Sequence, residues 1–176
     1  MKILFVIDMQ NDFIDGSLGT KEAKRIVQNV VKKINSHKED LIVATYDTHN
    51  DDYLKTLEGE KLPVPHCIFE TKGWELNTDI QHALNKCKNV KTKNKLTFGY
   101  TKWDEFLNNL VGDEKIEEIE ICGLCTDICV VSNALILRAT YKDIPIIVDS
   151  TCCAGVSQES HKAALQTMKM CQIDII

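Results

Sequence analysis

Three cysteines lie within eight residues of this chain, at Cys122, Cys125 and Cys129. They stand where an apolar run ends and a helical pattern begins, in the sequence Cys-Gly-Leu-Cys-Thr-Asp-Ile-Cys. Thiols at this spacing permit three chemistries. Cys122 and Cys125 could form a redox pair, all three thiolates could bind a metal or an iron–sulfur cluster, or one thiol could be a nucleophile at the start of a helix.

The surroundings of these cysteines favour the nucleophile. A redox pair needs its first cysteine exposed at the start of a helix, whereas Cys122 is predicted to end a buried strand. A metal or cluster site needs a fourth ligand, and none stands out in the sequence. If Thr126 or Asp127 begins the helix, Cys129 lies in its first turn, where free N–H groups and the helix dipole favour a thiolate and can hold an oxyanion. Such a thiol still needs a base.

Two charged residues at the ends of other apolar runs could serve Cys129. Asp8 ends the run Ile3–Ile7, and a carboxylate at the tip of a buried strand is partly desolvated, which raises its proton affinity towards that of a general base. Lys95 precedes the turn Leu-Thr-Phe-Gly-Tyr, where a cation can reach into a pocket. Taken singly, each has a simpler interpretation: Asp8 as the cap of a turn and Lys95 as a solvated lysine.

A second polar group could hold a metal ion. Asp47 and His49 lie two residues apart at a predicted strand end, and His66 follows in the next loop. Two histidines and one carboxylate make a facial set that suits zinc, iron or manganese and leaves coordination positions open. The spacing alone is weak, because isolated histidines are more often surface or hydrogen-bonded residues.

Alternating apolar runs and helical patterns must position these residues. Ala23, Ile26, Val27, Val30 and Ile34 recur at the spacing of one helix face, a helix is predicted from Thr101 through Leu110, and residues 128–141 are predicted to form a largely buried helix. Alternation of this kind predicts a three-layer α/β/α fold with a mostly parallel, Rossmann-like sheet. The predicted strands are Ile3–Ile7, Leu41–Ala44, Val90–Lys93, Ile116–Cys122, Ile144–Val148 and Ile173–Ile176.

The stretch from Thr48 to Trp74 breaks this rhythm and is predicted to be a long functional loop. It directly follows a buried strand. In open parallel sheets the ligand crevice lies at the carboxyl ends of the strands, and Asp8, Asp47 and Lys95 are all expected there.

Composition limits the class of protein. The 176 residues are 44% hydrophobic and carry a net charge of −5, which predicts one domain over residues 1–176 and gives no basic stripe for nucleic acid and no polybasic membrane anchor. The apolar run after Met1 and Lys2 is too short for a signal peptide or a membrane span. We therefore expect a cytoplasmic protein with reduced thiols and a small-molecule ligand.

Taken together, the motifs resemble those of the isochorismatase-like cysteine hydrolases, the superfamily that contains the nicotinamidases. The resemblance runs nearly from end to end. The motifs that carry it are Val6-Ile7-Asp8-Met9-Gln10-Asn11-Asp12-Phe13, Tyr46-Asp47-Thr48-His49, Pro65-His66-Cys67, Lys95-Leu96-Thr97-Phe98-Gly99 and Gly123-Leu124-Cys125-Thr126-Asp127-Ile128-Cys129-Val130.

This resemblance implies a triad of Asp8, Lys95 and Cys129 that cleaves the C–N bond of a small carboxamide through a thioester and releases ammonia. Backbone N–H groups of Cys125 and Cys129 would hold the oxyanion, and the Leu124–Cys125 peptide bond would be cis. Cys129 would then be the nucleophile, and Cys122 would belong to the core.

The resemblance also implies that Asp47, His49 and His66 hold a divalent metal, zinc before iron or manganese, that binds the ring nitrogen of a substrate such as nicotinamide or pyrazinamide. Nicotinamidases usually carry Trp-Pro where this chain has Pro63-Val64, so Phe13 and Phe98 are expected to line the substrate pocket instead. Relatives commonly associate, which makes a homo-oligomer an expectation for this chain.

Two alternatives stay open at this point. One is a related hydrolase acting on a carbamoyl amide or an isochorismate-type ether. The other, from a different class, is a thiol redox or metal-cluster protein built on Cys122, Cys125 and Cys129.

Overall fold

A parallel sheet forms the centre of the molecule. The computed structural model describes residues 1–37 and 40–176. Six strands pair in the order β3-β2-β1-β4-β5-β6, each parallel to its neighbours. Every predicted apolar run overlaps one of them, which confirms the α/β prediction. Their bounds are β1 Lys2–Ile7, β2 Leu41–Asp47, β3 Asn89–Lys95, β4 Glu118–Leu124, β5 Ile146–Ala154 and β6 Asp174–Ile175.

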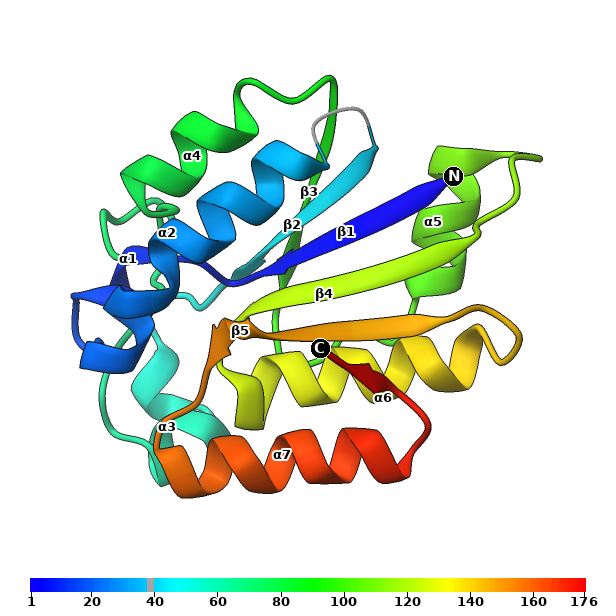
Figure 1. Cartoon of the computed structure of the whole chain (residues 1–176). Helices are drawn as coiled ribbons and strands as arrows, with labels where there is room; N and C mark the ends of the chain where they lie inside the picture. Colours follow the sequence, from blue (N-terminus) through cyan, green and yellow to red (C-terminus); the bar gives the residue numbers. More distant parts are fainter. Residues whose placement is uncertain (38–39) are drawn as a thin grey trace.

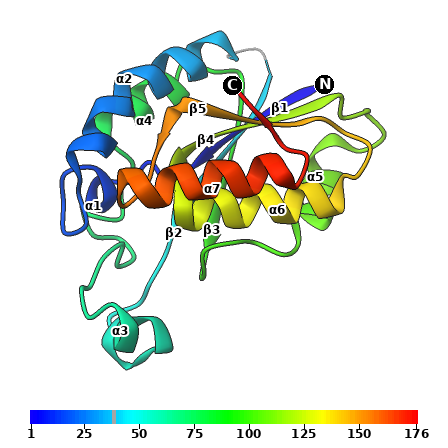
Figure 2. The same ribbon diagram turned by 60° about the horizontal axis from the view of Figure 1, so that its bottom comes forward.

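Helices cover both faces of the sheet and so give the three predicted layers (Figure 1). On one face α2 (Lys21–Ser36) packs against α4 (Thr78–Leu84), beside the short α1 (Asn11–Ile14). The other face carries α5 (Trp103–Val111), α6 (Val131–Thr140) and α7 (Gln158–Met170). Figure 2 shows α3 (Leu57–Lys61) set apart from these layers.

The alternation of side chains along β1 explains why helices lie on both sides. Ile3, Phe5 and Ile7 pack in the core shared with α5, α6 and α7, whereas Leu4 and Val6 pack in the core shared with α2 and α4. Successive side chains of a strand face opposite sides, so a strand that is apolar at every position must be buried on both. This requirement keeps β1 in the interior of the sheet and directs its carboxyl end into the crevice.

Two helices begin differently from the sequence-based prediction. The helix predicted over residues 128–141 begins earlier, because Thr126–Val130 is a π-helical turn that runs directly into α6, with helical backbone at both Val130 and Val131. Much of α6 is only half-buried, so the prediction of a largely buried helix was wrong. The other helix, α5, begins at Trp103 rather than at Thr101. Trp103 is fully buried and packs edge-on against Phe5, with ring centroids 4.9 Å apart, which fixes the first turn against the sheet.

The region from Thr48 to Trp74 is a long connection, as predicted, but it is not devoid of structure. It contains the 3-10 turn η1 (Tyr53–Lys55) and α3. The Thr56 side chain accepts a hydrogen bond from the Gly59 N–H and so begins α3. The connection therefore brings side chains from its middle back to the crevice.

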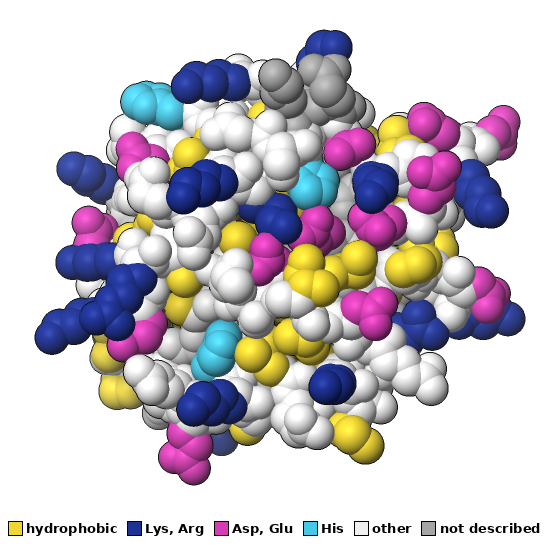
Figure 3. Space-filling view, viewed as in Figure 1, with side chains coloured by type: hydrophobic (Ala, Val, Ile, Leu, Met, Phe, Trp, Pro, Cys, Tyr) yellow, Lys and Arg dark blue, Asp and Glu magenta, His cyan; other side chains and the backbone are white. Residues whose placement is uncertain are grey.

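The surface carries mixed charge. On the face shown in Figure 3, basic and acidic side chains are interspersed. Within the described ranges, 1–37 and 40–176, no helix is long and apolar enough to cross a membrane.

Candidate active site

The predicted site residues come together at the carboxyl end of the sheet. Asp8 directly follows β1, while Asp47 and Lys95 are the last residues of β2 and β3 and lie opposite one another in the register of those strands. Cys125 directly follows β4, and Cys129 lies in the π-helical turn beyond it. Parallel strands end at the same edge, so residues separated by more than a hundred positions share one crevice.

A buried ion pair lies at the base of this crevice. Lys95 Nζ donates to Asp8 Oδ2 at 2.7 Å, and neither side chain is exposed to solvent. The Thr45 hydroxyl donates to Asp8 Oδ1 at 2.6 Å and accepts from the Asp8 N–H at 3.1 Å. Asp8 itself has a left-handed backbone conformation, with φ of 45°, that is uncommon for a residue other than glycine. Thr45 therefore fixes both the backbone and the carboxylate of Asp8.

Burial determines the proton affinity of this pair. Desolvation raises the pKa of the Asp8 carboxyl, and the positive charge of Lys95 offsets this only in part. Burial also lowers the pKa of Lys95, but Asp8, Cys129 and Asp47 together raise it by more, so the net shift is upwards. A carboxylate with a raised pKa beside a charged lysine can accept a proton and return it.

The turn that carries Cys129 is tied to the end of β4. The Leu124–Cys125 peptide bond is cis, as the resemblance implies. The Cys125 carbonyl accepts hydrogen bonds from the N–H groups of Ile128 at 3.1 Å and Val130 at 3.0 Å. Gly123 has φ of 121°, and a Cβ there would lie 2.1 Å from the Ile7 carbonyl oxygen, so only glycine permits this close approach of β4 to β1. This close approach brings the turn that carries Cys125 and Cys129 next to Asp8, the residue that follows Ile7.

Cys129 differs from the expected thiolate. The residue is only 4% exposed, and burial, followed by the negative charge of Asp8, raises the pKa of its thiol well above the usual value, although Lys95 acts in the opposite direction. The free protein therefore holds a neutral thiol beside the Asp8–Lys95 pair. Desolvation and the charge of Asp8 therefore act against the thiolate that the helix-start pattern favours.

Cys122 lies in the core, as the resemblance implies. It is fully buried in β4, and burial raises the pKa of its thiol well above the usual value. Cys122, Cys125 and Cys129 are all free thiols. A buried, protonated Cys122 does not suit the exposed attacking position of a redox pair.

The three predicted metal ligands also converge, together with a fourth residue that the sequence analysis missed. One ligand atom each from Asp47, His49, Glu58 and His66 lies within 4.8 Å of the others. Asp47 Oδ2 is 3.0 Å from His49 Nε2 and 3.5 Å from His66 Nε2. Glu58 lies in α3, and the only sequence signal for it is a carboxylate in the connection between the two histidines.

The chemistry of this group fits a divalent metal. Asp47 Oδ1 is buried and has no hydrogen-bond partner among the described residues, a costly state for a carboxylate oxygen that a cation would relieve. The Val64 carbonyl lies 2.8 Å from His66 Nδ1, which leaves Nε2 facing Asp47. Imidazole nitrogens with carboxylate oxygens form a donor set that zinc, iron and manganese accept.

Two further polar residues hold the metal-binding group in place. Gln10 is fully buried, accepts a hydrogen bond from the Asp47 N–H at 2.8 Å and donates to the Asp47 carbonyl at 2.9 Å. Asp12 Oδ2 accepts from the Cys67 N–H at 2.8 Å, next to His66. Both residues belong to the stretch of polar residues that follows β1, but their roles were not predicted, because side-chain bonds to a distant backbone leave no pattern in the sequence.

A narrow cavity of about 40 Å³ joins these groups. Its polar lining contains Asp47, Glu58 and His66, and Cys125 and Cys129 line it as well. The apolar lining contains Phe13 and Phe98, the two predicted pocket residues, together with Leu18, Leu62 and Ile128. Among the described residues no tryptophan lines it, and Tyr53 instead packs on the rings of His49 and His66, with centroid distances of 4.7 and 5.0 Å.

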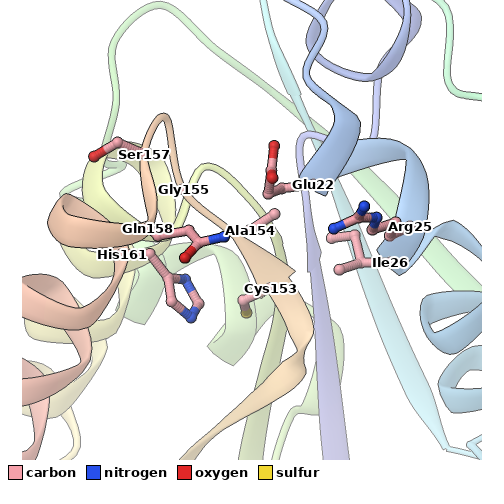
Figure 4. A pocket seen from close by; sticks show the side chains of 9 residues that line it. All are labelled: Glu22, Arg25, Ile26, Cys153, Ala154, Gly155, Ser157, Gln158 and His161. Atoms are coloured by element: carbon pink, nitrogen blue, oxygen red, sulfur yellow. The ribbon is translucent and has the colours of Figure 1, made fainter.

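A larger cavity, of about 230 Å³, lies between the beginnings of α2 and α7 (Figure 4). It is lined by Arg25, Ile26 and His161 among others and contains none of the predicted site residues. His161 Nδ1 lies 2.8 Å from the hydroxyl of Thr126, in the turn that carries Cys129. Cavity volume alone therefore does not locate the reactive groups.

Comparison with known proteins identifies the class of protein to which this fold and polar crevice belong. The family model described as the isochorismatase domain matches residues 2–176, and the chain belongs to this family. It is 26% identical to the nicotinamidase/pyrazinamidase of Mycobacterium tuberculosis over 190 residues, which cover 100% of this chain and 98% of that protein.

Solved structures agree with this assignment. The nicotinamidase/pyrazinamidase PncA of Bacillus subtilis superposes with a TM-score of 0.83 at 27% identity, covering 99% of this chain and 98% of the other. The pyrazinamidase of Pyrococcus horikoshii, solved in complex with zinc, gives a TM-score of 0.75 at 26% identity with the same coverage. The parallel α/β architecture described above is thus that of solved nicotinamidases.

Proposed function

We propose that this protein is an amidase that hydrolyses a small aromatic carboxamide, of the nicotinamide and pyrazinamide type, to the carboxylic acid and ammonia. One observation carries the proposal: the Cys129 thiol, whose pKa is influenced by the buried Asp8–Lys95 pair, lines the same narrow cavity as Asp47, Glu58 and His66. The relatives named above, which are nicotinamidases and pyrazinamidases, support the same reaction.

The residues would act in two half-reactions. The Cys129 proton passes to Asp8 as the sulfur attacks the amide carbon, and N–H groups of Cys125 and Cys129 stabilise the oxyanion. Asp8 then gives this proton to the amide nitrogen, the C–N bond breaks, and ammonia leaves a thioester on Cys129. In the second half, Asp8 removes a proton from water, which attacks the thioester, and returns the proton to the departing sulfur. Lys95 keeps Asp8 oriented and balances its charge throughout.

Asp47, His49 and His66 would hold a divalent metal, with Glu58 close enough to contribute. When bound, the metal supplies a Lewis acid to which a ring nitrogen can coordinate. We propose zinc, because the donor set suits it and because the structure of the Pyrococcus horikoshii pyrazinamidase is a complex with zinc. The apolar side chains of Phe13 and Phe98 would contact the two faces or edges of the ring.

Two wider expectations belong to the same proposal. Residues 1–176 are proposed to act as one catalytic domain, since both cores pack against a single sheet and the site residues gather at its carboxyl end. Free thiols at Cys67, Cys122 and Cys171 fit a reducing compartment, so we place the enzyme in the cytoplasm.

The test is a measurement of ammonia release from nicotinamide, pyrazinamide, a carbamoyl amide and an aliphatic amide. We expect turnover of the two ring amides and a decrease of about 10- to 100-fold for His66→Ala or after metal removal confirmed by elemental analysis. His82→Ala, which removes a histidine of α4 outside the metal-binding group, is the matched control and should retain activity. Absence of ring-amide turnover by the metal-loaded enzyme would refute the proposal, whereas full turnover after metal loss would refute only the role of the metal.

A further inference from the structure

One wall of the narrow cavity belongs to a segment in which the two apolar side chains nearest to β3, Leu96 and Phe98, are exposed. Phe98 follows β3 and Lys95, and it lines the cavity that contains Cys129. Its side chain is nevertheless 40% exposed, and the neighbouring Leu96 is 77% exposed. Burial of these two side chains therefore contributes little to fixing the segment, and another group must determine where Phe98 lies.

Asn133 supplies the missing attachment. Its Nδ2 group donates to the Phe98 carbonyl at 2.9 Å and to the Cys129 carbonyl at 2.8 Å. Its Oδ1 accepts from the Tyr100 N–H at 3.1 Å and from Trp103 Nε1 at 2.9 Å. The residue is fully buried, and these four bonds use both donors and both acceptor positions of the amide. Because two partners are carbonyls and two are N–H groups, only one orientation of the amide satisfies them all.

Gly99, next to Phe98, also packs closely against side chains of α6. A Cβ on Gly99 would lie 2.6 Å from Ile136 Cδ1 and 3.3 Å from Ser132 Cβ, both on α6. The segment that carries Phe98 thus rests directly on the helix that follows Cys129. Asn133, on that helix, joins the two through one side chain.

We propose that Asn133 is a positioning residue that fixes the separation between the Cys129 thiol and the Phe98 wall, and so orients the ring of the substrate for attack on its amide carbon. This inference rests on the proposed function. Attack needs the sulfur about 3–3.5 Å from the carbon, and a displacement of about 1 Å can lower a rate by about 100-fold. A buried amide with four fixed partners can restrain the position of Phe98 on this length scale. A loop with exposed side chains cannot.

The test compares Asn133→Asp with the wild type in two reactions of the same thiol. Asp keeps the size and an acceptor oxygen but loses the amide donors to Phe98 and Cys129. We expect kcat/KM for nicotinamide to fall by about 10- to 100-fold, while the rate of Cys129 alkylation by iodoacetamide, which needs no ring contact, changes by less than about threefold. Leu137→Ala, one turn further along α6 and also fully buried, should lower the melting temperature and leave kcat/KM within about twofold.

A double-mutant cycle with Phe98→Ala separates positioning from general damage. If Asn133 acts through the wall, the double variant should be little worse than the poorer single variant, since the two changes remove the same restraint. If Asn133→Asp does not fold, Asn133→Ser takes its place in the cycle, because a hydroxyl retains one donor. Multiplicative losses, or an equal fall in alkylation and turnover, would overturn the inference while leaving the proposed function intact. A wild-type enzyme that releases no ammonia from any ring amide would overturn both.

Discussion

Two groups of buried charged residues differ in whether every carboxylate oxygen has a hydrogen-bond or ion-pair partner. Under α2, Lys33 lies 2.8 Å from Asp149 and also pairs with Glu120, whose other oxygen is 3.0 Å from His37. Thr151 donates twice to the remaining oxygen of Asp149. We call these residues, Lys33, His37, Glu120 and Asp149, the α2 cluster. Each of its carboxylate oxygens has a partner, so the cluster has the form of a structural contact.

The crevice group, made of Asp8, Asp47, Lys95 and Cys129, is arranged differently. Lys95 and Asp8 pair without solvent, but burial raises the pKa of Asp8, the neighbouring thiol is neutral, and one Asp47 oxygen has no hydrogen-bond partner among the described residues. Groups left in this state cost stability and are poised to take a proton or a cation. The comparison therefore separates charge that stabilises the fold from charge that is available for chemistry.

The sharpest test of this distinction removes the thiol. Cys129→Ala should lower kcat by at least about 1,000-fold, because no other group forms the thioester, with little change in melting temperature. Cys122→Ala removes a fully buried thiol of β4 and should keep activity within severalfold. Ammonia release and thermal unfolding measure the two effects. Substantial activity in the Cys129→Ala protein would eliminate this residue as the nucleophile.

Replacing the lysine of the crevice group should affect both activity and stability. Lys95→Met leaves Asp8 buried without its counter-charge, and we expect a loss of about 3–5 kcal/mol in the free energy of unfolding together with loss of turnover. Urea denaturation gives the free energy. The double variant Asp8→Asn/Lys95→Met removes both charges and should recover much of the stability but none of the activity. If the double variant were no more stable than Lys95→Met, the unpaired charge would not be the cause.

The equivalent change in the α2 cluster should affect stability alone. Lys33→Met is expected to cost about 2–3 kcal/mol at pH 7, below the loss for Lys95→Met because Lys33 keeps some exposure to water, and to leave kcat/KM per folded molecule unchanged. Urea denaturation and ammonia release on the same samples check this. A fall in kcat/KM comparable to that of Lys95→Met would contradict the separation of the two groups.

The pH dependence of the Lys33→Met effect has a definite sign. Burial raises the pKa values of Glu120 and Asp149, but hydrogen bonds from His37 and Lys33 to Glu120, and from Lys33 and Thr151 to Asp149, lower them by more. Carboxyls with a lowered pKa in the folded state contribute stability above their unfolded values of about 4.3 and 3.9, and lose it as the pH falls through the folded values. Without Lys33 this contribution shrinks, so the stability difference between wild type and variant should be largest at neutral pH and decrease as the pH falls below about 4. A difference independent of pH would show that lost packing, rather than charge, is responsible.

The smallest expected effect concerns Thr45, which fixes Asp8 without carrying charge. Thr45→Val keeps the shape of the side chain but removes the hydroxyl that bonds to both the Asp8 carboxylate and its N–H. We expect a loss of about 1–2 kcal/mol in stability and a decrease of about tenfold in kcat, with an altered pH–rate profile because Asp8 loses one stabilising hydrogen bond. Thr45→Ser, which keeps the hydroxyl, should behave like the wild type in the pH–rate profile.

Individual residues show which features of the site could be predicted from the sequence and which could not. The continuous apolar run Ile3–Ile7 required a strand buried on both faces, and the placement of Asp8 at its carboxyl end followed from that. Asp47 and Lys95 were placed in the same way, since they end β2 and β3. Glu58, Thr45 and Asn133 were missed, because each acts through a contact with a residue distant in the sequence.

The sequence by itself determined which strands are buried, the edge of the sheet at which the polar residues gather, and the thiol, carboxylate and imidazole groups available there. Periodicity follows from local burial, which short-range patterns record. The order of the strands in the sheet came only from the structure. Only the tertiary structure decided that the Cys129 thiol is neutral, that one oxygen of Asp47 lacks a hydrogen-bond partner among the described residues, and that Asn133 joins the Cys129 turn to Phe98. Desolvation and hydrogen-bond satisfaction depend on every group that surrounds an atom, and these groups come from several strands and helices at once.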